Sequence, residues 1–502
     1  MSSSAPAAPL PPAPPLSAAG PRAALDRSLL GGIAWTGGVR WVSQLLGWAS
    51  TLVVARLLTP ADYGIVGMAA VFVGLVTLLS EFGLGAAVVM LRDLDGAQAR
   101  QINTLSVMLG VASAAVTCAA ALPMARLMAT PELEGVLWAL SAGFVIAGFR
   151  TVPDALLQKE MRFRSLALMD GGQAVLVALS TMAMAAAGAR YWTLVAGTLL
   201  GGLLSTGMAV ARRPQGFAVP RPRQVGPAMA FSGRLLVSRL AWYLYSNADF
   251  MVVGKVLGQR ALGAYNLAWS LAAIPIGKVS GMVMRVTPAY FSAVQDDPPA
   301  LRRYLLRLTE GVALVTFPMT LGLAAVADDL VRVALGEKWL AAAVPLRLLA
   351  AYASLRSISP LLSQVLAAVG EMPFAMRNNL LAAVILPAAF VAAAPYGVGA
   401  VAWAWIVVHP LVLAPLLART CRRLQMPVRD YVRALAPALG GCAAMLAAVV
   451  LARLATPGAW PLGARFAIEV AAGAATYAAA ILLFHRDRLL ALRRLLRDAP
   501  AA

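Results

Sequence analysis

The residues of this chain that could do chemistry are charged side chains in the middle of long apolar runs. A cation at the centre of a membrane-spanning helix costs roughly 2.5–3.5 kcal/mol, so it normally faces a partner or a water-filled cavity. Five cations lie about two or more turns from the nearest predicted helix end. They are Arg40, Arg239, Lys278, Arg285 and Arg356. Together they would cost more than about 12 kcal/mol in lipid, so we expect them to face protein, water or a ligand.

Acids at a comparable depth are fewer. Glu81, Asp170 and Asp249 are candidates for coupling to H⁺ or Na⁺, or for a plain counter-ion role. Even if all three pair with cations, positive charge remains in excess, which favours a cationic cavity for an anionic ligand. Arg150 and Asp154 are four residues apart on one helix, so we expect them to form a structural ion pair.

Further polar residues share helical faces with the cations. Lys278 and Arg285 are seven residues apart, which places them on one face two turns apart. The predicted polar lining consists of Gln44, Tyr243 and Asn247. Polar stripes of this kind line cavities or hold neighbouring helices together, and the sequence leaves both readings open.

The composition identifies the class of protein. Of 502 residues, 60% are hydrophobic and 13% are charged, whereas soluble domains carry about 25% charged residues. Apolar runs of about 20 residues recur along the chain, which predicts an all-α polytopic membrane protein. Three cysteines with no CxxC spacing indicate neither a metal site nor a disulfide framework. We therefore expect no cofactor, and we attribute the net charge of +20 to loops rather than to nucleic-acid binding.

About fourteen spans are predicted, with ends uncertain by several residues. They cover residues 30–56, 63–91, 101–122, 135–157, 165–188, 191–211, 228–255, 263–291, 305–331, 343–369, 378–394, 397–418, 432–452 and 463–484. With the N-terminus inside, inner loops carry about 25 Lys and Arg and outer loops about 9, which predicts that both termini are cytoplasmic. No loop is long enough to form a soluble domain.

The spans group into two lobes followed by an extra helix pair. The predicted organisation is a disordered Pro/Ala-rich tail (1–28), an N-lobe (29–211), a basic Pro-rich linker (212–227), a C-lobe (228–418), a helix pair (431–484) and a basic tail (485–502). An internal repeat supports this division, since residues 55–69 align with residues 254–268 at an offset of 199. Gly64 and Gly263 are identical positions in the two copies. Repeats of this kind are common in transporters, whose substrate sites lie between the halves.

Several segments are distinctive, among them ARLLTPADYGIVGMAAVF (55–72), EFGLGAAVV (81–89), QKEMRFRSLALMD (158–170), NADFMVVGKVLGQRALGAYNLAWSLAAIP (247–275) and GEKWLAAAVPLRLLAAYASLRSISPLLSQVLAAVGE (336–371). They resemble the Wzx-type (colanic acid exporter-like) polysaccharide flippases of the multidrug/oligosaccharidyl-lipid/polysaccharide superfamily. The resemblance spans residues 30–375 in the family's order. It implies two six-helix lobes around a central cavity that is lined by the first two helices of each lobe.

The resemblance implies a flippase rather than an enzyme. Its substrate would be a polyprenyl-pyrophosphate-linked oligosaccharide repeat unit, moved across the bacterial inner membrane by alternating access for exopolysaccharide or O-antigen-type export. It also implies a polysaccharide polymerase and co-polymerase as partners. The alternatives are a multidrug/cation antiporter of the same superfamily, which the surplus of cations disfavours, and a membrane polymerase or glycosyltransferase. No GxxxxGK[ST] loop is present, so the energy source is a gradient or downstream consumption of the product.

Overall fold

The fold is entirely helical in the part of the chain that the structure describes. The computed structural model describes residues 46–484, apart from residues 48, 82–83 and 91–94. Ten of the described helices are long and apolar enough to cross a membrane. The predicted class, an all-α polytopic membrane protein, is confirmed.

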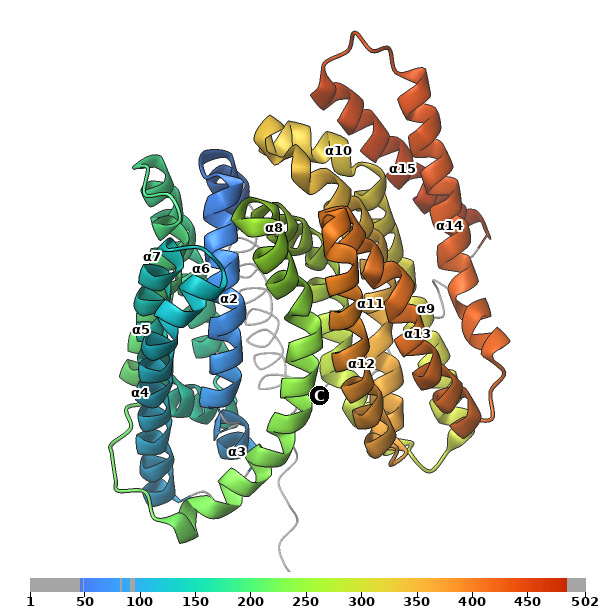
Figure 1. Ribbon diagram of the computed structural model, residues 1–502. Helices are drawn as coiled ribbons and strands as arrows, with labels where there is room; N and C mark the ends of the chain where they lie inside the picture. Colours follow the sequence, from blue (N-terminus) through green and yellow to red (C-terminus); the bar gives the residue numbers. More distant parts are fainter. Residues whose placement is uncertain (1–45, 48, 82–83, 91–94, 485–502) are drawn as a thin grey trace, which may run out of the picture.

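The N-lobe occupies one side of the molecule, from blue to green in Figure 1. Its helices are α2 (Pro60–Glu81), α3 (Leu84–Met90), α4 (Gly96–Leu127), α5 (Glu132–Lys159), α6 (Phe163–Ala186) and α7 (Trp192–Arg212). Residues 49–57 are also helical and lead into α2. The predicted span at 63–91 covers most of α2 and all of the short α3, and residues 82–83 between them lie outside the described part.

The predicted linker, residues 212–227, overlaps a segment without helix. Residues 213–221 are not helical, but the next helix begins at Pro222 rather than near residue 228. The extended segment packs along the start of α4, where Thr104 Oγ1 accepts from Ala218 N (3.1 Å) and Gln101 Oε1 accepts from Arg221 N (2.9 Å). We call this end of the molecule, at the bottom of Figure 1, the linker end.

Helix α8 (Pro222–Ala293) contains two spans joined by a sharp break. Gly258 has φ 81° and ψ 176°, a conformation that a residue with a side chain rarely adopts, so the α-helix is interrupted there. The sequence predicted a turn at residues 256–263 between two spans, and this prediction is confirmed. The break lies at the opposite end from the linker, which we call the α10 end after the short helix α10 (Ala327–Leu330) at the top of Figure 1.

The remaining helices of the C-lobe run alternately toward the α10 end and toward the linker end. They are α9 (Pro298–Ala325), α10, η1 (Val331–Leu335), η2 (Glu337–Ala342), α11 (Ala343–Ala368), α12 (Met372–Ala393), η3 (Ala394–Tyr396) and α13 (Val398–Arg423). Helix starts follow local chemistry: Asp297 caps α9 by accepting from Ala300 N (3.0 Å), and Asp95 caps α4 in a capping box with Gln98.

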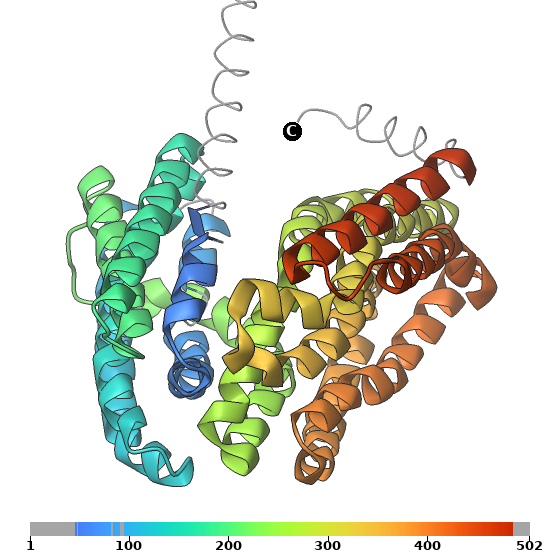
Figure 2. The ribbon, with the colours of Figure 1, turned by 90° about the horizontal axis from the view of Figure 1, so that it is seen from above.

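Helices α14 (Val428–Ala455) and α15 (Leu462–Phe484) form the predicted extra pair. Figures 1 and 2 show the pair on the side of the C-lobe that faces away from the N-lobe. Tyr477 of α15 donates to Leu314 O of α9 (2.7 Å), which joins the pair to the lobe.

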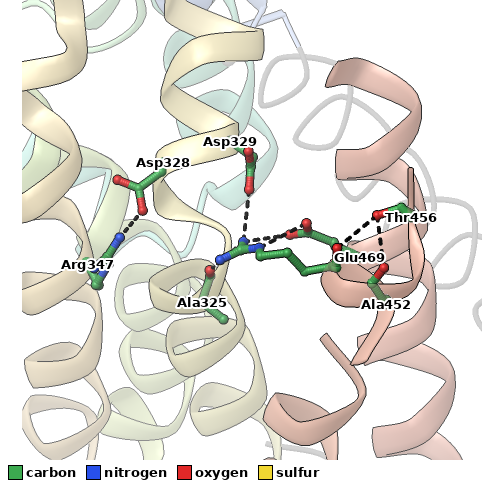
Figure 3. Close-up of polar contacts among 8 residues, drawn as sticks. Ala325, Asp328, Asp329, Arg347, Ala452, Thr456 and Glu469 are labelled. Carbon is green, nitrogen blue, oxygen red and sulfur yellow. Dashed lines mark hydrogen bonds and ion pairs between the residues drawn. The ribbon is translucent and has the colours of Figure 1, made fainter. Parts of the chain in front are cut away.

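An ion cluster also attaches the pair, at the α10 end (Figure 3). Arg453 at the end of α14 contacts the fully buried Glu469 of α15 (2.7 Å) and Asp329 of α10 (2.9 Å). It also donates to Ala325 O at the end of α9 (3.3 Å). One guanidinium thus holds three elements together.

The largest apolar cluster of the described residues belongs to both lobes. It joins Ala55, Ile65 and Leu133 of the N-lobe to Leu262 and Trp339 of the C-lobe, all buried. These residues lie toward the α10 end, so the lobes pack against each other there. Burial of apolar surface, at about 25 cal/mol per Å², stabilises that contact.

Candidate functional site

Most of the predicted cationic site lies outside the side chains that the structure describes. Arg40 and Gln44 lie before the described residues. The described backbone places Glu81 at the end of α2, and Arg239, Lys278 and Arg285 within α8. Their side chains are outside the described part, so their grouping around a cavity stays a prediction.

Asp249 is fully buried in α8 and has fixed partners. Its Oδ2 accepts hydrogen bonds from the Tyr265 hydroxyl (2.6 Å) and from Trp405 Nε1 (2.9 Å). Tyr265 belongs to the second span of α8 and Trp405 to α13, so the carboxylate joins three spans of the C-lobe. Its Oδ1 has no hydrogen-bond partner among the described residues.

Arg356 of α11 is the one predicted cavity cation whose side chain is described. Its guanidinium carbon lies 4.7 Å from the centroid of the Trp269 ring, in cation–π geometry. Trp269 stacks with Tyr352 (6.1 Å) and Trp405 (5.9 Å), and Trp405 is the residue that holds Asp249. Aromatic faces therefore support this cation, and no ion pair joins it to an acid in the described part of the chain.

Two predicted lining residues lie where the lobes face each other. Tyr243 of α8 donates its hydroxyl to Val71 O of α2 (2.7 Å), which links the C-lobe to the N-lobe. Asn247, one turn later, donates to Tyr243 O (2.9 Å). Both line a cavity of about 130 Å³ whose other walls are mainly Met and Leu side chains of α2, α4 and α8. A polar edge on an apolar recess suits an amphipathic molecule.

The N-lobe contains a separate polar network around Arg150 of α5. Arg150 lies 3.7 Å from Asp154, which confirms the predicted ion pair, and 3.9 Å from Asp170 of α6. It also donates to Gln173 Oε1 (3.3 Å) and Ser205 Oγ (2.9 Å). Asp170 therefore has a cation partner within its own lobe. Its proposed role in coupling stays a prediction.

The repeat-related glycines lie where the backbones of the two lobes approach each other closely, at the α10 end. A Cβ on Gly64 of α2 would lie 1.8 Å from Gln259 O, and one on Gly263 of α8 would lie 1.6 Å from Pro60 O. At the offset of 199, Gly263 is the counterpart of Gly64, and Gln259 is the counterpart of Pro60. The two contacts are thus related by the repeat, and each requires glycine because backbone atoms would meet any side chain.

Two repeat-related cations also contact the opposite lobe at this end. Arg56 Nε donates to Ala334 O (2.7 Å) in η1 of the C-lobe. Its counterpart Lys255 donates to Leu127 O at the end of α4 in the N-lobe. Each cation thus reaches a backbone carbonyl near the end of a helix in the opposite lobe, where the helix dipole is negative.

Segment η2 adds further contacts between the two lobes at the α10 end. Trp339 is fully buried, donates from Nε1 to Ala55 O (2.8 Å) and meets Tyr63 edge to face at 5.3 Å. Lys338 donates to Arg56 O (2.5 Å), and burial lowers the pKa of its ammonium while nearby Asp62 opposes that shift. We refer to these contacts, those of residues 55–64 with residues 259–263 and 333–339 and that of Lys255 with Leu127, as the α10-end closure.

Sequence reasoning missed two acidic residues with fixed partners. Glu469 lies within the predicted span 463–484 but was not counted among the membrane acids, and it pairs with Arg453. Asp62 is buried, with Oδ1 3.4 Å from Arg190 and Oδ2 bound to the Thr59 backbone and hydroxyl. A test of every acid in every apolar run against the available cations would have found Glu469.

The fold and its contacts define a class: a polytopic membrane transporter of two repeat-related lobes that close on each other at one end. A profile of the family described as "Polysaccharide biosynthesis protein" matches residues 53–344. The chain belongs to this family. The matched residues include the whole α10-end closure.

Two kinds of relative agree with this assignment. The chain is 26% identical over 367 residues to "Lipopolysaccharide biosynthesis protein WzxC" of Escherichia coli K12, covering 71% of this chain and 73% of that protein. Its fold is similar to a structure of "Lipid II flippase MurJ, inward closed conformation", with a TM-score of 0.71, 15% identity and coverage of 91% and 100%. An inward-facing multidrug resistance MATE transporter of the MOP superfamily has a TM-score of 0.63 at 16% identity, covering 76% and 94%. The sequence resemblance is thus confirmed for the polysaccharide biosynthesis family, and the two solved structures share the fold.

Proposed function

We propose that this chain is a flippase that moves a lipid-linked oligosaccharide across the membrane for polysaccharide export. The observation that carries the proposal is membership of the polysaccharide biosynthesis family over residues 53–344. A flippase for lipid II shares the fold along 91% of the chain, which supports the same architecture. The protein is a transporter rather than a catalytic enzyme.

The substrate class follows from the chemistry that needs a protein. A pyrophosphate–sugar headgroup cannot cross hydrocarbon unaided because its charges and hydroxyls would lose their water. Arginine donors in a cavity replace that hydration with charge-assisted hydrogen bonds. Arg40, Arg239, Lys278, Arg285 and Arg356 are the residues we propose for this role. The polyprenyl tail remains in lipid while the headgroup moves.

Alternating access is the proposed mechanism, and the α10-end closure supports it. The glycine crossings and the Arg56 and Lys255 contacts hold the lobes together at one end. Releasing those contacts while the lobes close at the linker end would move access from one face to the other. Each hydrogen bond to a carbonyl in this closure has a net value of about 0.5–3 kcal/mol. The apolar cluster that the lobes share at this end must also be exposed or replaced when it opens.

Orientation, coupling and partners complete the proposal. With both termini in the cytoplasm of a bacterial inner-membrane protein, the α10 end faces the periplasm and the closure blocks the outer side. Glu81, Asp170 and Asp249 are the proposed sites for H⁺ or Na⁺ coupling or for counter-ions. A polymerase and co-polymerase would consume the flipped repeat unit.

The decisive experiment is mass spectrometry of lipid-linked oligosaccharides in a deletion strain. We expect the polymer to disappear and a complete polyprenyl-pyrophosphate repeat unit to accumulate, and we expect the wild-type gene to reverse both changes. An unchanged polymer and lipid pool in a strain with no second flippase would contradict the proposal. Drug sensitivity of the same strain then tests the antiporter alternative.

A further inference from the structure

A recess at the linker end has no part in the transport mechanism described above. It lies on the C-lobe, between the first turns of α9 and the turn from α13 to α14, and has a volume of about 520 Å³. Its walls are Pro298, Pro299, Arg302, Arg303, Leu306, Arg307, Leu424 and Gln425. Three arginines on one short stretch of helix make this recess strongly cationic.

The arginines have different partners. Arg302 forms an ion pair with Asp430 in the first turn of α14, which fixes α9 against α14 beside the recess. Arg303 and Arg307 are exposed, and neither forms an ion pair with an acid in the described part of the chain. They are four residues apart on one helical face, where like charges repel by a few tenths of a kcal/mol. An anion placed between them would remove that repulsion.

The chemistry of the recess selects a particular kind of anion. Helix α9 begins with Pro298 and Pro299, which have no N–H groups, so the helix start offers few backbone donors and recognition falls to the guanidinium groups. Leu306 and Leu424 add an apolar wall beside the charges. A phosphate that carries an apolar portion fits both features better than a free inorganic anion.

The position of the recess agrees with this chemistry. Helix α9 is long and apolar enough to span the membrane, and its first turns line the recess. The end of a spanning helix lies at the level of the lipid headgroups. Basic pockets between spanning helices at this level bind anionic lipid headgroups.

We propose that this recess binds the phosphate of an anionic membrane glycerophospholipid, with Arg303 and Arg307 as its donors. The site is separate from the substrate path, and the proposal does not depend on the proposed transport function. An occupied site would brace α9 against the α13–α14 turn and so tie the C-lobe to the lipid around it.

Native mass spectrometry of the full-length chain tests the proposal, with phosphatidylglycerol and phosphatidylcholine as probes. We expect the wild-type protein to retain phosphatidylglycerol in preference to phosphatidylcholine. The double variant Arg303→Gln/Arg307→Gln should bind phosphatidylglycerol roughly 30-fold more weakly, since each basic residue near a membrane surface contributes about fivefold. The matched control Arg100→Gln/Arg377→Gln removes two exposed arginines at the same end that do not line the recess, and it should bind as wild type does.

Other outcomes would overturn the proposal. If the double variant retains phosphatidylglycerol as well as wild type does, the recess is not the binding site. If the control variant loses as much binding as the double variant, net charge explains the effect. Displacement of phosphatidylglycerol by millimolar inorganic phosphate would identify a free-anion site instead. Thermal unfolding in phosphatidylcholine provides the folding check, because substitutions of exposed side chains usually change stability by less than about 0.5 kcal/mol.

Discussion

Single substitutions can separate a structural role from an ion-coupling role for the buried carboxylate of Asp249. One oxygen accepts from Tyr265 and Trp405, and the other has no described hydrogen-bond partner. Asparagine is nearly isosteric and can keep both accepted bonds by placing its carbonyl oxygen in the Oδ2 position. The two roles therefore predict different results for the same substitution.

We expect Asp249→Asn to fold and to export polymer, because it preserves the two hydrogen bonds. Asp249→Ala should lower stability by about 2–5 kcal/mol, since it leaves a buried hydroxyl and a buried indole N–H unpaired. Thermal unfolding of the purified variants and polymer assays in a complemented deletion strain measure both effects. Normal stability of Asp249→Asn with loss of export would assign the residue to ion coupling.

Glu371 forms an ion triad at the linker end. It accepts from Arg419 (2.9 Å) and also pairs with Arg423, both at the end of α13. Burial by itself would raise the pKa of this carboxyl, but the hydrogen bonds from Arg423 and Arg419 outweigh it and lower the pKa below its ordinary value. A lowered pKa means that the charged form stabilises the fold.

The sign of that shift predicts a pH dependence. The stabilisation is complete above the ordinary glutamate pKa of about 4.3 and is lost as the pH falls through the lower pKa of the folded state. We expect Glu371→Gln to unfold at a lower temperature than wild type at pH 7, and the difference to shrink below about pH 4. Unfolding curves of the purified protein from pH 7 to pH 3 check this, and a difference that grows on acidification would contradict it.

At the scale of elements, the close approach of α2 and α8 depends on two glycines. We expect Gly64→Ala and Gly263→Ala to prevent the α10-end closure, because each new Cβ would lie less than 2 Å from a backbone oxygen. A cysteine introduced at Leu58, which is only 3% exposed, should then react faster with a membrane-impermeant maleimide.

Gly458→Ala is the matched control for these variants. It lies between α14 and α15, and nothing lies within 4 Å of its added Cβ. Labelling at Leu58→Cys should be unchanged in this background. Equal labelling in the Gly64→Ala and Gly458→Ala backgrounds would show that the closure tolerates a side chain.

The attachment of the extra helix pair depends on Arg453. Removing it would leave the fully buried Glu469 without its cation, and breaking a buried ion pair costs about 3–5 kcal/mol. Since Arg453 itself is 38% exposed, we expect the lower part of that range for Arg453→Ala. The predicted result is faster proteolysis at the α14–α15 loop of the purified protein. Arg465→Ala, which removes an arginine of α15 outside this ion cluster, serves as the comparison.

For the molecule as a whole, its orientation in the membrane determines which side of the membrane the closed α10 end faces. We expect reporter fusions after residue 221 to be active in the cytoplasm, and fusions after residue 458 to be active in the periplasm. The reverse pattern would place the α10-end closure on the cytoplasmic side. It would leave the lobes and their contacts unchanged but would reverse the proposed direction of access.

The helical membrane class, most helix positions and the family could be predicted from the sequence alone. Apolar runs of about 20 residues have few alternatives to helices in lipid, because every backbone group must be paired within the segment. The glycine-containing repeat at residues 55–69 and 254–268 also identified the two places where helices turn. The predicted turn in α8 is the break at Gly258.

Which of these elements contact each other could not be predicted from the sequence, because it depends on how the helices pack. The repeat did not reveal that Gly64 lies against Gln259 and Gly263 against Pro60, since that contact needs both lobes in place. Nor did the sequence show that Asp249 binds Tyr265 and Trp405. Partners of a buried polar group come from distant segments, and their choice depends on how whole helices pack rather than on local spacing.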